Sequence, residues 1–407
     1  MLALQKLTSQ GYRVIAFGST ELSKPITSLD ELPKKLRLEF AGFVAVADIL
    51  RPEAKRAVNA ALRAGVTVRM ITGDHFETAY HIGKSLGMVD NRSQVFDCRQ
   101  MAAMSDDELA EVIEHTRVFS RVVPEQKYRI LSSLKKHDIT AMTGDGVNDV
   151  PAVSNANVGI AMGSGSQITK DAGDIVLLDD NFKSIIDAMR EGRAIIANIR
   201  RMLFYLLATN TGEVLIMVGA LVLGMPLPLA AVQLLWVNLV TDTAMVIPLG
   251  LEPGEKDSMT QKPQSPNAPI LSRFNLVHMI LIALTMAVTT LGFYAFFSQS
   301  HGHAYASTIA FISLVVIQWA NAFNARSVYE STFSRLRVFN GKLYIGLAVA
   351  IGLQALVIFG PLQEMLHVTT VMIGDMVFVA AISFILPLII GEVYKFFGRV
   401  YLKRRDA

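Results

Sequence analysis

The sequence predicts a doubly wound α/β half followed by an all-α bundle of six transmembrane helices. In the first 200 residues, short apolar runs alternate with helical patterns, which is typical of a parallel sheet connected by crossover helices. In the remainder, apolar segments of about 20 residues follow one another, the length a helix needs to cross a hydrocarbon core of ~30 Å. The chain has 407 residues, enough for two or more domains. We expect the divisions 1–24, 25–200 and 201–407.

Five apolar runs are predicted to be strands of the parallel sheet: 43–47, 66–71, 139–142, 158–162 and 175–178. Helical patterns lie between them, at 52–64, 75–87, 106–115 and 124–136. Functional loops of such sheets follow the carboxyl ends of strands. We therefore look for chemistry in the loops that begin at Thr72 and Thr143.

The predicted membrane segments are 203–223, 229–250, 276–297, 305–325, 342–362 and 372–394. A helical pattern over 181–202 continues into the first of them, which predicts a long stalk helix joining the two halves. Pro248 is expected to break the second segment and Pro387 to kink the sixth. Lys and Arg occur in every second loop (251–275, 326–342) and in the tail, so both termini are predicted to be cytoplasmic.

Charge and cysteine content exclude several classes of protein. The net charge of +3 is small and gives no indication of a nucleic-acid partner. A single cysteine, Cys98, excludes an internal disulfide framework and a metal site made of cysteines alone. His301 and His303 in a predicted outside loop are interpreted as solvated residues rather than as metal ligands.

Two carboxylates mark the loop after the strand at 139–142. Asp145 and Asp149 lie four residues apart within Thr143–Asp149, where glycines allow the backbone to approach a phosphate or a metal closely. Mg²⁺ prefers a few hard oxygen ligands supplemented by water and phosphate oxygens. We therefore predict that both carboxylates hold Mg²⁺, with the Asn148 amide binding phosphate or orienting a carboxylate.

Thr72-Gly73-Asp74 occupies the equivalent position after another strand. The Thr72 hydroxyl is predicted to donate to a phosphoryl oxygen, and Lys127 to neutralise the charge of that group. A threonine, a lysine and an acidic pair are three of the four parts of a haloacid-dehalogenase-like phosphotransferase. The fourth part is a nucleophilic aspartate at the end of the first strand.

Polar side chains lie inside the first two membrane segments. Asn210 and Glu213 share one face of the first, and Asn238, Thr241 and Asp242 share one face of the second. Ionisable residues within a membrane usually face a transport pathway or a partner. Two carboxylates and three neutral oxygen donors on adjacent helices therefore predict a cage for a hard cation.

The motifs together resemble the P-type cation-transporting ATPases. The resemblance rests on Thr143–Ala152, Thr72–Asp74, Asp48–Arg51 and Lys127, and it continues through all six membrane segments. It implies a haloacid-dehalogenase-like phosphorylation domain that uses ATP and Mg²⁺. It also implies catalytic roles for Thr72, Gly73, Asp74, Lys127 and Asn148, Mg²⁺ binding by Asp145 and Asp149, and nucleotide-proximal positions for Asp48 and Arg51.

The chain departs from the family pattern at the nucleophile. The family's Asp-Lys-Thr-Gly-Thr and Thr-Gly-Glu-Ser motifs do not occur in it, and residues 1–24 resemble only the end of the nucleotide-binding domain. We therefore expect a carboxyl-terminal portion of a pump, truncated or split, with a gap in its sheet and no ATP hydrolysis by itself. The expected partners are a cation, the lipid bilayer of the cell membrane and the amino-terminal half as a separate chain.

The membrane motifs resemble those of the calcium pumps of the type II branch. In those pumps Asn-x-x-Glu and Asn-x-x-Thr-Asp supply ligands, which implies Ca²⁺ as the cation. Gln318 matches a position where reticulum-type calcium pumps carry Glu and where plasma-membrane calcium pumps and sodium/potassium pumps carry Gln. The alternatives are a Na⁺/K⁺-type pump and a non-catalytic membrane protein that regulates an intact pump. A phosphatase on an unrelated anchor is disfavoured, since an inert anchor needs neither Glu213 nor Asp242.

Overall fold

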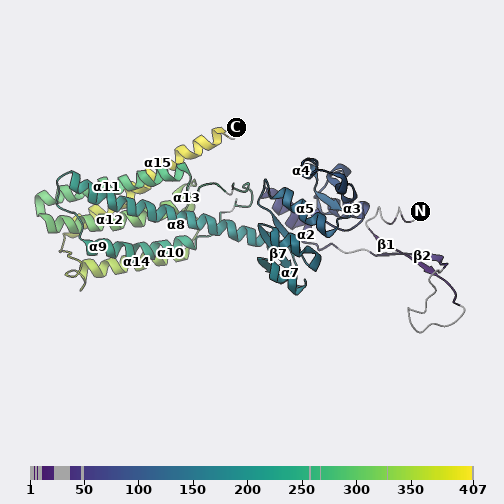
Figure 1. The fold of residues 1–407 in the computed structure, drawn as a ribbon. Coiled ribbons are helices and arrows are strands. Elements are labelled where there is room, and N and C mark those ends of the chain that lie inside the picture. Colours follow the sequence, from purple (N-terminus) through teal and green to yellow (C-terminus); the bar gives the residue numbers. More distant parts are fainter. Residues whose placement is uncertain are drawn as a thin grey trace. The chain divides into compact units, whose positions relative to one another are not determined.

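The computed structural model describes residues 4, 7, 12–22, 37–46, 50–255, 258–265, 267–327 and 329–405 (Figure 1). The chain divides into two compact units, one formed by Met1–Arg190 with Lys256–Pro266 and the other by Glu191–Glu255 with Asn267–Ala407. The division falls within helix α8 (Phe182–Val222). The predicted stalk and the first membrane segment are therefore one continuous helix.

The parallel strands of the first unit form two separate three-stranded sheets. One has the order β3 (Met70–Ile71), β5 (Val118–Ser120), β4 (Val95–Asp97), and the other the order β6 (Ala141–Gly144), β7 (Val158–Met162), β8 (Ile175–Leu177). The strands that lead into the two motif loops, β3 and β6, are each at an edge. Among the described residues, no strand is hydrogen-bonded between them.

The predicted pairing of one strand is wrong. The sequence predicts that the run 43–47 belongs to the parallel sheet, but its described residues belong to β2 (Glu39–Val46), which pairs antiparallel with β1 (Arg13–Ser19). An apolar run indicates a strand without indicating its neighbour, which explains the error. Conversely, the sequence does not predict β4 and β5, because runs of three residues are too short to show a period.

The helices of the first unit begin and end at capping residues. Helix α4 (Asp106–His115) begins with a capping box: Glu108 N donates to Ser105 Oγ (3.3 Å), and Ser105 N donates to Glu108 Oε2 (2.8 Å). Helix α3 (Phe76–Leu86) ends at Gly87, whose φ of +76° suits glycine. The other elements are α2 (Ala54–Arg63), η2 (Arg92–Gln94), η3 (Cys98–Ala103), α5 (Pro124–Leu134), η4 (Val147–Asp149), α6 (Val150–Asn155) and α7 (Gln167–Ala172).

Cys98 lies in a hydrophobic core of the first unit. Its side chain is fully buried and shares this cluster with Leu109 and Ile113 of α4, Phe119 of β5 and Ile130 of α5. The cysteine is free, and burial raises the pKa of its thiol to about 12. Cys98 therefore remains a protonated, apolar core residue at neutral pH.

The second unit is a helical bundle. Six of its helical stretches are long and apolar enough to cross a membrane within the described residues: Phe182–Val222, Ala231–Gly250, Arg273–His301, His303–Ala325, Gly341–Phe359 and Ile373–Val400. The six predicted membrane segments are thus confirmed as helices. The elements after α8 are α9 (Ala231–Trp236), η5 (Val237–Thr241), α10 (Asp242–Gly250), α11 (Arg273–His301), α12 (His303–Ala325), α13 (Thr332–Leu336), α14 (Gly341–Phe359) and α15 (Ile373–Arg405).

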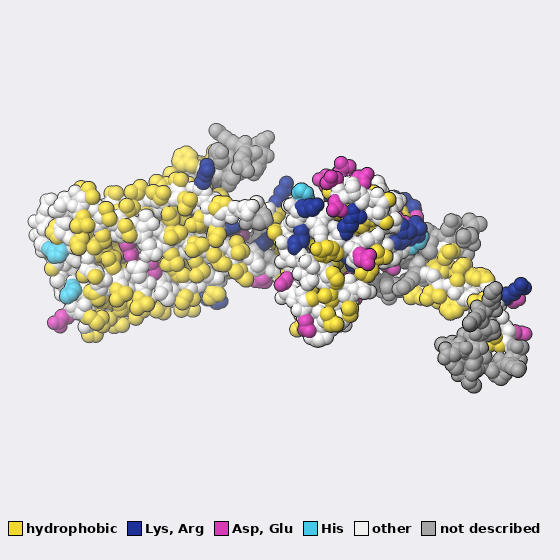
Figure 2. Space-filling model, in the orientation of Figure 1, with side chains coloured by type: hydrophobic (Ala, Val, Ile, Leu, Met, Phe, Trp, Pro, Cys, Tyr) yellow, Lys and Arg dark blue, Asp and Glu magenta, His cyan; other side chains and the backbone are white. Residues whose placement is uncertain are grey.

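Helix α12 is the most buried of these helices, and it packs against α11 and α15 (Figure 1). Hydrophobic side chains cover most of the visible face of the helical unit, whereas charged side chains concentrate on the α/β unit (Figure 2). Exposed apolar residues on α8, such as Val214, Val218 and Leu221, contribute to this surface. A continuous apolar surface of this kind is suited to contact lipid.

The second membrane segment is interrupted before its proline. Residues Val237–Thr241 form a π-helical turn between α9 and α10, whereas Pro248 lies inside α10, two residues from its end at Gly250. The break predicted at Pro248 thus coincides with the end of the helix, and the irregularity within the segment is the π turn. Such turns are frequent at functional sites.

Candidate functional sites

Two groups of polar side chains carry the predicted chemistry, one in each unit. The first begins where β3 ends. Thr72 N donates to Phe119 O (2.9 Å) and Val122 N donates to Thr72 O (3.0 Å), so this loop is fixed against the end of β5. The Thr72 hydroxyl donates to Asp74 Oδ2 (2.8 Å) and accepts from Asp74 N (3.1 Å). Thr72 and Asp74 therefore hold each other in place.

Asp149 is the central residue of the loop after β6. It is buried, with 6% of its surface exposed. Its Oδ2 accepts weak hydrogen bonds from Asp145 N (3.3 Å) and Gly146 N (3.5 Å), and Lys127 Nζ donates to its Oδ1 at 2.5 Å. Lys127 comes from α5, which follows β5, so this ion pair joins the two sheets of the unit.

The turn around Asp149 requires a glycine. A Cβ atom on Gly144 would lie 2.5 Å from Asp149 Cβ, so a larger residue would displace the carboxylate. Ser166 N donates to Asp145 O (2.8 Å), and the Thr169 hydroxyl donates to Gly146 O (2.9 Å), which fixes the turn from the side of α7. These contacts leave the Asp145 side chain exposed.

The predicted phosphoryl residues are therefore only partly brought together. Lys127 and Asp149 are in contact, but no hydrogen bond or ion pair within the described residues joins the Thr72 loop to the Asp145 loop. The Asn148 side chain is exposed. Arg51 donates from Nη1 to Asp179 O at 3.5 Å, and Asp48 lies outside the described residues.

The carboxylates of this loop fit a Mg²⁺ ion that keeps most of its water. Among the described residues, no group of three or more His, Cys, Asp or Glu side chains is arranged to hold a metal. Mg²⁺ is commonly bound by one or two carboxylates together with water and substrate phosphate oxygens. Exposed Asp145 is suited to direct contact, and Asp149, paired with Lys127, to a supporting role.

The second group lies in the helical unit and contains two buried carboxylates. Asp242, the first residue of α10 after the π turn, is 1% exposed. The Tyr205 hydroxyl donates to its Oδ1 (2.9 Å). The Thr209 hydroxyl lies 3.3 Å from its Oδ2 and has one proton to share between this oxygen and the backbone carbonyls of Tyr205 (3.1 Å) and Leu206 (3.0 Å). Tyr205 and Thr209 belong to α8 and were not predicted as site residues. Their spacing of four residues, continued by Glu213, indicates one polar helix face and is the signal that would have identified them.

Glu213 connects three helical elements. Asn238 Nδ2 from η5 donates to its Oε2 (2.8 Å), and Gln318 Nε2 from α12 donates to its Oε1 (3.0 Å). Glu213 is 7% exposed, and Gln318 is fully buried with an Oε1 atom that has no hydrogen-bond partner. Three of the residues predicted from separate segments therefore meet at one point.

The other two predicted cation ligands are placed differently. The Thr241 hydroxyl is buried and donates to Val237 O (2.8 Å), so it serves the π turn in this state. Asn210 is exposed and is not among the side chains that contact Glu213 or Asp242.

The side chains that donate hydrogen bonds to the two carboxylates can also present oxygen atoms to a cation. Amides of Asn238 and Gln318 present N–H groups to Glu213, but rotation of either amide would present its oxygen instead. Hydroxyls of Tyr205 and Thr209 likewise keep oxygen lone pairs available. A cation entering here would meet two carboxylates and several neutral oxygens, the ligand set that hard cations prefer.

Comparison with known proteins identifies both halves. Residues 226–397 match the family described as cation transporting ATPase, C-terminus. Residues 3–157 and 128–189 each match haloacid dehalogenase-like hydrolase families.

Curated relatives resemble the chain over most of its length. A calcium-transporting ATPase of Bacillus subtilis is 38% identical over 93% of this chain and 43% of the relative. Calcium-transporting ATPase 1 of Bacillus cereus is 35% identical, over 97% and 46% respectively. Probable cation-transporting ATPase F of Mycobacterium tuberculosis is 34% identical, over 96% and 44%. The chain thus spans less than half the length of these relatives.

Proposed function

Because this chain belongs to the P-type cation-transporting ATPases, as a carboxyl-terminal portion of them, we propose that it forms the cation-translocating part of an ATP-driven Ca²⁺ pump. The observation that carries the proposal is the pair of buried carboxylates, Glu213 and Asp242, surrounded by amides and hydroxyls from α8, η5 and α12. Two carboxylates can balance the charge of one divalent ion, and buried charge of this kind within a membrane usually serves transport.

The first unit would supply phosphoryl chemistry to this pump. Thr72, Gly73, Asp74, Lys127 and Asn148 would bind and orient the phosphoryl group, with Asp48 and Arg51 nearer the nucleotide ATP. Asp145 and Asp149 would hold Mg²⁺, which when bound neutralises charge on the transferring group. Lys127 is positioned for this work because Asp149 fixes its ammonium group at 2.5 Å.

The phosphorylated aspartate of the proposed pump lies outside these 407 residues, which contain no Asp-Lys-Thr-Gly-Thr motif. The edges of β3 and β6 support this arrangement, since among the described residues each motif-bearing strand pairs on one side only, and a further strand can pair on the other. Phosphorylation would therefore require the portion of the pump that the relatives carry in addition, and this chain by itself would be inactive in ATP hydrolysis.

Tryptophan fluorescence tests the cation site. The two tryptophans of the chain, Trp236 and Trp319, adjoin the π turn and Gln318. We expect Ca²⁺ to change their emission saturably in the purified chain in nanodiscs. Asp242→Asn should weaken this binding about 10- to 100-fold, because a charge-assisted contact is lost.

Asp375→Asn is the matched control, since Asp375 also accepts a tyrosine hydroxyl, that of Tyr305, at 2.6 Å, but lies at the start of α15. Its Ca²⁺ affinity should equal that of the parent chain. A Ca²⁺ affinity of Asp242→Asn equal to that of the parent chain would show that Asp242 is not part of the site.

A monovalent-cation pump is the second candidate. Gln318 favours it, because an amide in place of a carboxylate lowers the negative charge around Glu213. The same titration distinguishes the two: a response to Na⁺ or K⁺ at concentrations where Ca²⁺ gives none would assign the site to monovalent ions.

A further inference from the structure

We propose that a charged cluster of three buried residues, Arg201, Glu252 and Arg326, and the half-buried Glu255 fixes the relative positions of the helices that carry the cation ligands and thereby sets cation affinity. The inference rests on the proposed function of the Glu213–Asp242 site. It assigns the four residues a positioning role, since none of them contacts Glu213 or Asp242.

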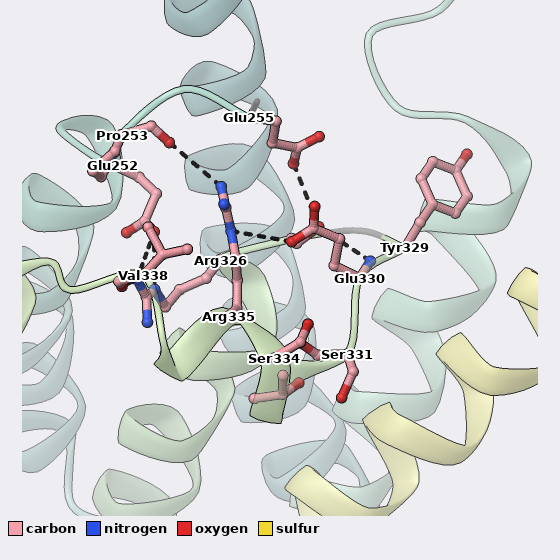
Figure 3. Close-up of polar contacts among 12 residues, drawn as sticks. Glu252, Pro253, Glu255, Arg326, Tyr329, Glu330, Ser331, Ser334, Arg335 and Val338 are labelled. Carbon is pink, nitrogen blue, oxygen red and sulfur yellow. Dashed lines mark hydrogen bonds and ion pairs between the residues drawn. The ribbon is translucent and has the colours of Figure 1, made fainter. Parts of the chain in front are cut away.

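Glu252 and Arg326 form the centre of the cluster (Figure 3). Arg326 donates to Glu252 Oε1 from Nε (3.0 Å) and Nη2 (2.8 Å), and the two side chains are 1% and 0% exposed. Arg326 follows the last residue of α12, and Glu252 lies two residues beyond α10. The pair therefore joins the ends of the helices that carry Gln318 and Asp242.

Neighbouring amides extend this connection to α14. Asn340 Nδ2 donates to Glu252 Oε2 (2.6 Å), while its Oδ1 accepts from Leu343 N (3.2 Å) and caps α14. Arg326 Nη2 also donates to Val338 O (2.5 Å) in the segment before that helix, as Figure 3 shows. Glu252 thus has hydrogen-bond partners on both carboxylate oxygens, which compensates for its burial.

Two side chains of α8 bind the end of α10 and the segment that follows it. Asn198 Nδ2 donates to Gly250 O and to Glu252 O, each at 3.0 Å, and so caps the end of α10. Arg201 Nη2 donates to Glu255 Oε1 at 2.8 Å, and its side chain is 2% exposed. Ser327, next to Arg326, donates to that same Glu255 oxygen at 3.4 Å.

The cluster lies close enough to affect the ligands. At 1.5 Å of rise per residue, Arg326 is about 12 Å from Gln318 along α12, and Arg201 about 18 Å from Glu213 along α8. A helix transmits a displacement of its end as a rigid rod over such a length. Removal of one partner would leave a buried unpaired charge, which forces the helix ends to rearrange.

The test uses the complete chain with Trp236→Phe, so that Trp319 alone reports on α12 next to Gln318. We expect Glu252→Gln to weaken Ca²⁺ binding about tenfold, within the range typical of coupled sites. Arg326→Lys keeps the charge but loses the paired geometry, so it should cause a smaller loss. A purely structural role would lower the melting temperature and leave the affinity unchanged.

Glu330→Gln is the matched control. Glu330 lies 3.7 Å from Arg335 in the same group of loops and is 46% exposed at its side chain (Figure 3). Within the described residues, no hydrogen bond or ion pair of its carboxylate reaches a helix that carries a proposed ligand, and Arg335 keeps its hydrogen bond from Nη2 to Pro253 O (3.4 Å) in the variant. Its affinity should equal that of the parent. Parent-like affinity in a folded Glu252→Gln protein would overturn the proposal. If that variant does not fold, parent-like affinity in Arg326→Lys would do so.

Failure of the proposed function gives a different result. In that case the parent shows no response to Ca²⁺, Na⁺ or K⁺, and the cluster is tested by Trp319 emission in ion-free buffer. A shift in Glu252→Gln that is absent from Glu330→Gln would still support the positioning role. Identical emission in all three proteins would overturn it.

Discussion

At the scale of single residues, the candidate cation site is held together by donors that substitute for the charge of an ion. Each oxygen of Glu213 accepts one amide N–H, and each oxygen of Asp242 lies within hydrogen-bond distance of one hydroxyl. Sequence spacing predicted Glu213, Asn238 and Asp242, because i, i+3 and i+4 positions share a helix face. Contact between Gln318 and Glu213 spans 105 positions of the chain, and only the resemblance, not spacing, indicated it.

Cys98 provides a prediction at this scale, because the reactivity of its thiol shows whether the hydrophobic core of the α/β unit is folded. Burial raises the pKa from 9.0 to about 12, so at pH 9 the thiolate fraction should be about 500-fold below that of an exposed cysteine. The unfolded chain loses its thiol proton from pH 9 upward while the folded chain retains it, so the stability of the folded form should fall between pH 9 and 12.

The measurement is iodoacetamide labelling of the parent chain at pH 9, with and without urea. We expect slow labelling in buffer and fast labelling in urea. Labelling in buffer at the rate of free cysteine would contradict the packing of Cys98 with Leu109 and Phe119.

At the scale of elements, the sequence predicts those features that depend on the residues of a single segment. Long apolar segments predicted the membrane helices, and Ser105 with Glu108 is a readable start for α4. The partner of β2 and the π turn at Val237–Thr241 could not be predicted in the same way. Strand pairing depends on distant segments, and a π turn retains the residue pattern of an α-helix.

Removal of the α4 cap gives the element-scale prediction. Ser105→Ala loses the acceptor for Glu108 N and should lower the free energy of unfolding by about 1 kcal/mol. Hydrogen bonds from Ser105 lower the pKa of Glu108, so its contribution to the cap is present at neutral pH and is lost as pH falls through that pKa.

The urea midpoint of Cys98 labelling measures this effect, because Leu109 and Ile113 of α4 pack in the same cluster as Cys98. Ser154→Ala, an exposed serine of α6, is the control and should leave the midpoint unchanged. A urea midpoint of Ser105→Ala equal to that of the parent chain would show that the stability of α4 does not determine when Cys98 becomes exposed.

At the scale of the whole molecule, the two units carry different parts of the proposed chemistry. In the part of the chain that the structure describes, β3 and β6 each lie at the edge of a three-stranded sheet of the α/β unit, and the buried carboxylates Glu213 and Asp242 lie in the helical unit. Helix α8 belongs to both, since it is the element that follows β8 in the chain and carries Tyr205, Thr209 and Glu213 further along. In the proposed pump, one continuous helix would therefore connect the phosphorylation unit with the cation site.

Membrane orientation is the prediction that belongs to this scale. The distribution of Lys and Arg predicts that 251–275 and 326–342 lie on the cytoplasmic side and 298–304 on the opposite side. Single cysteines introduced as Ser265→Cys, Ser334→Cys and Ser298→Cys test this in cells, because native Cys98 is buried and reacts slowly. A membrane-impermeant maleimide should label only the Ser298→Cys protein from outside, and all three after the membrane is opened. Labelling of Ser265→Cys or Ser334→Cys in intact cells would reverse the orientation, and with it the side from which the proposed Glu213–Asp242 site would take up its ion.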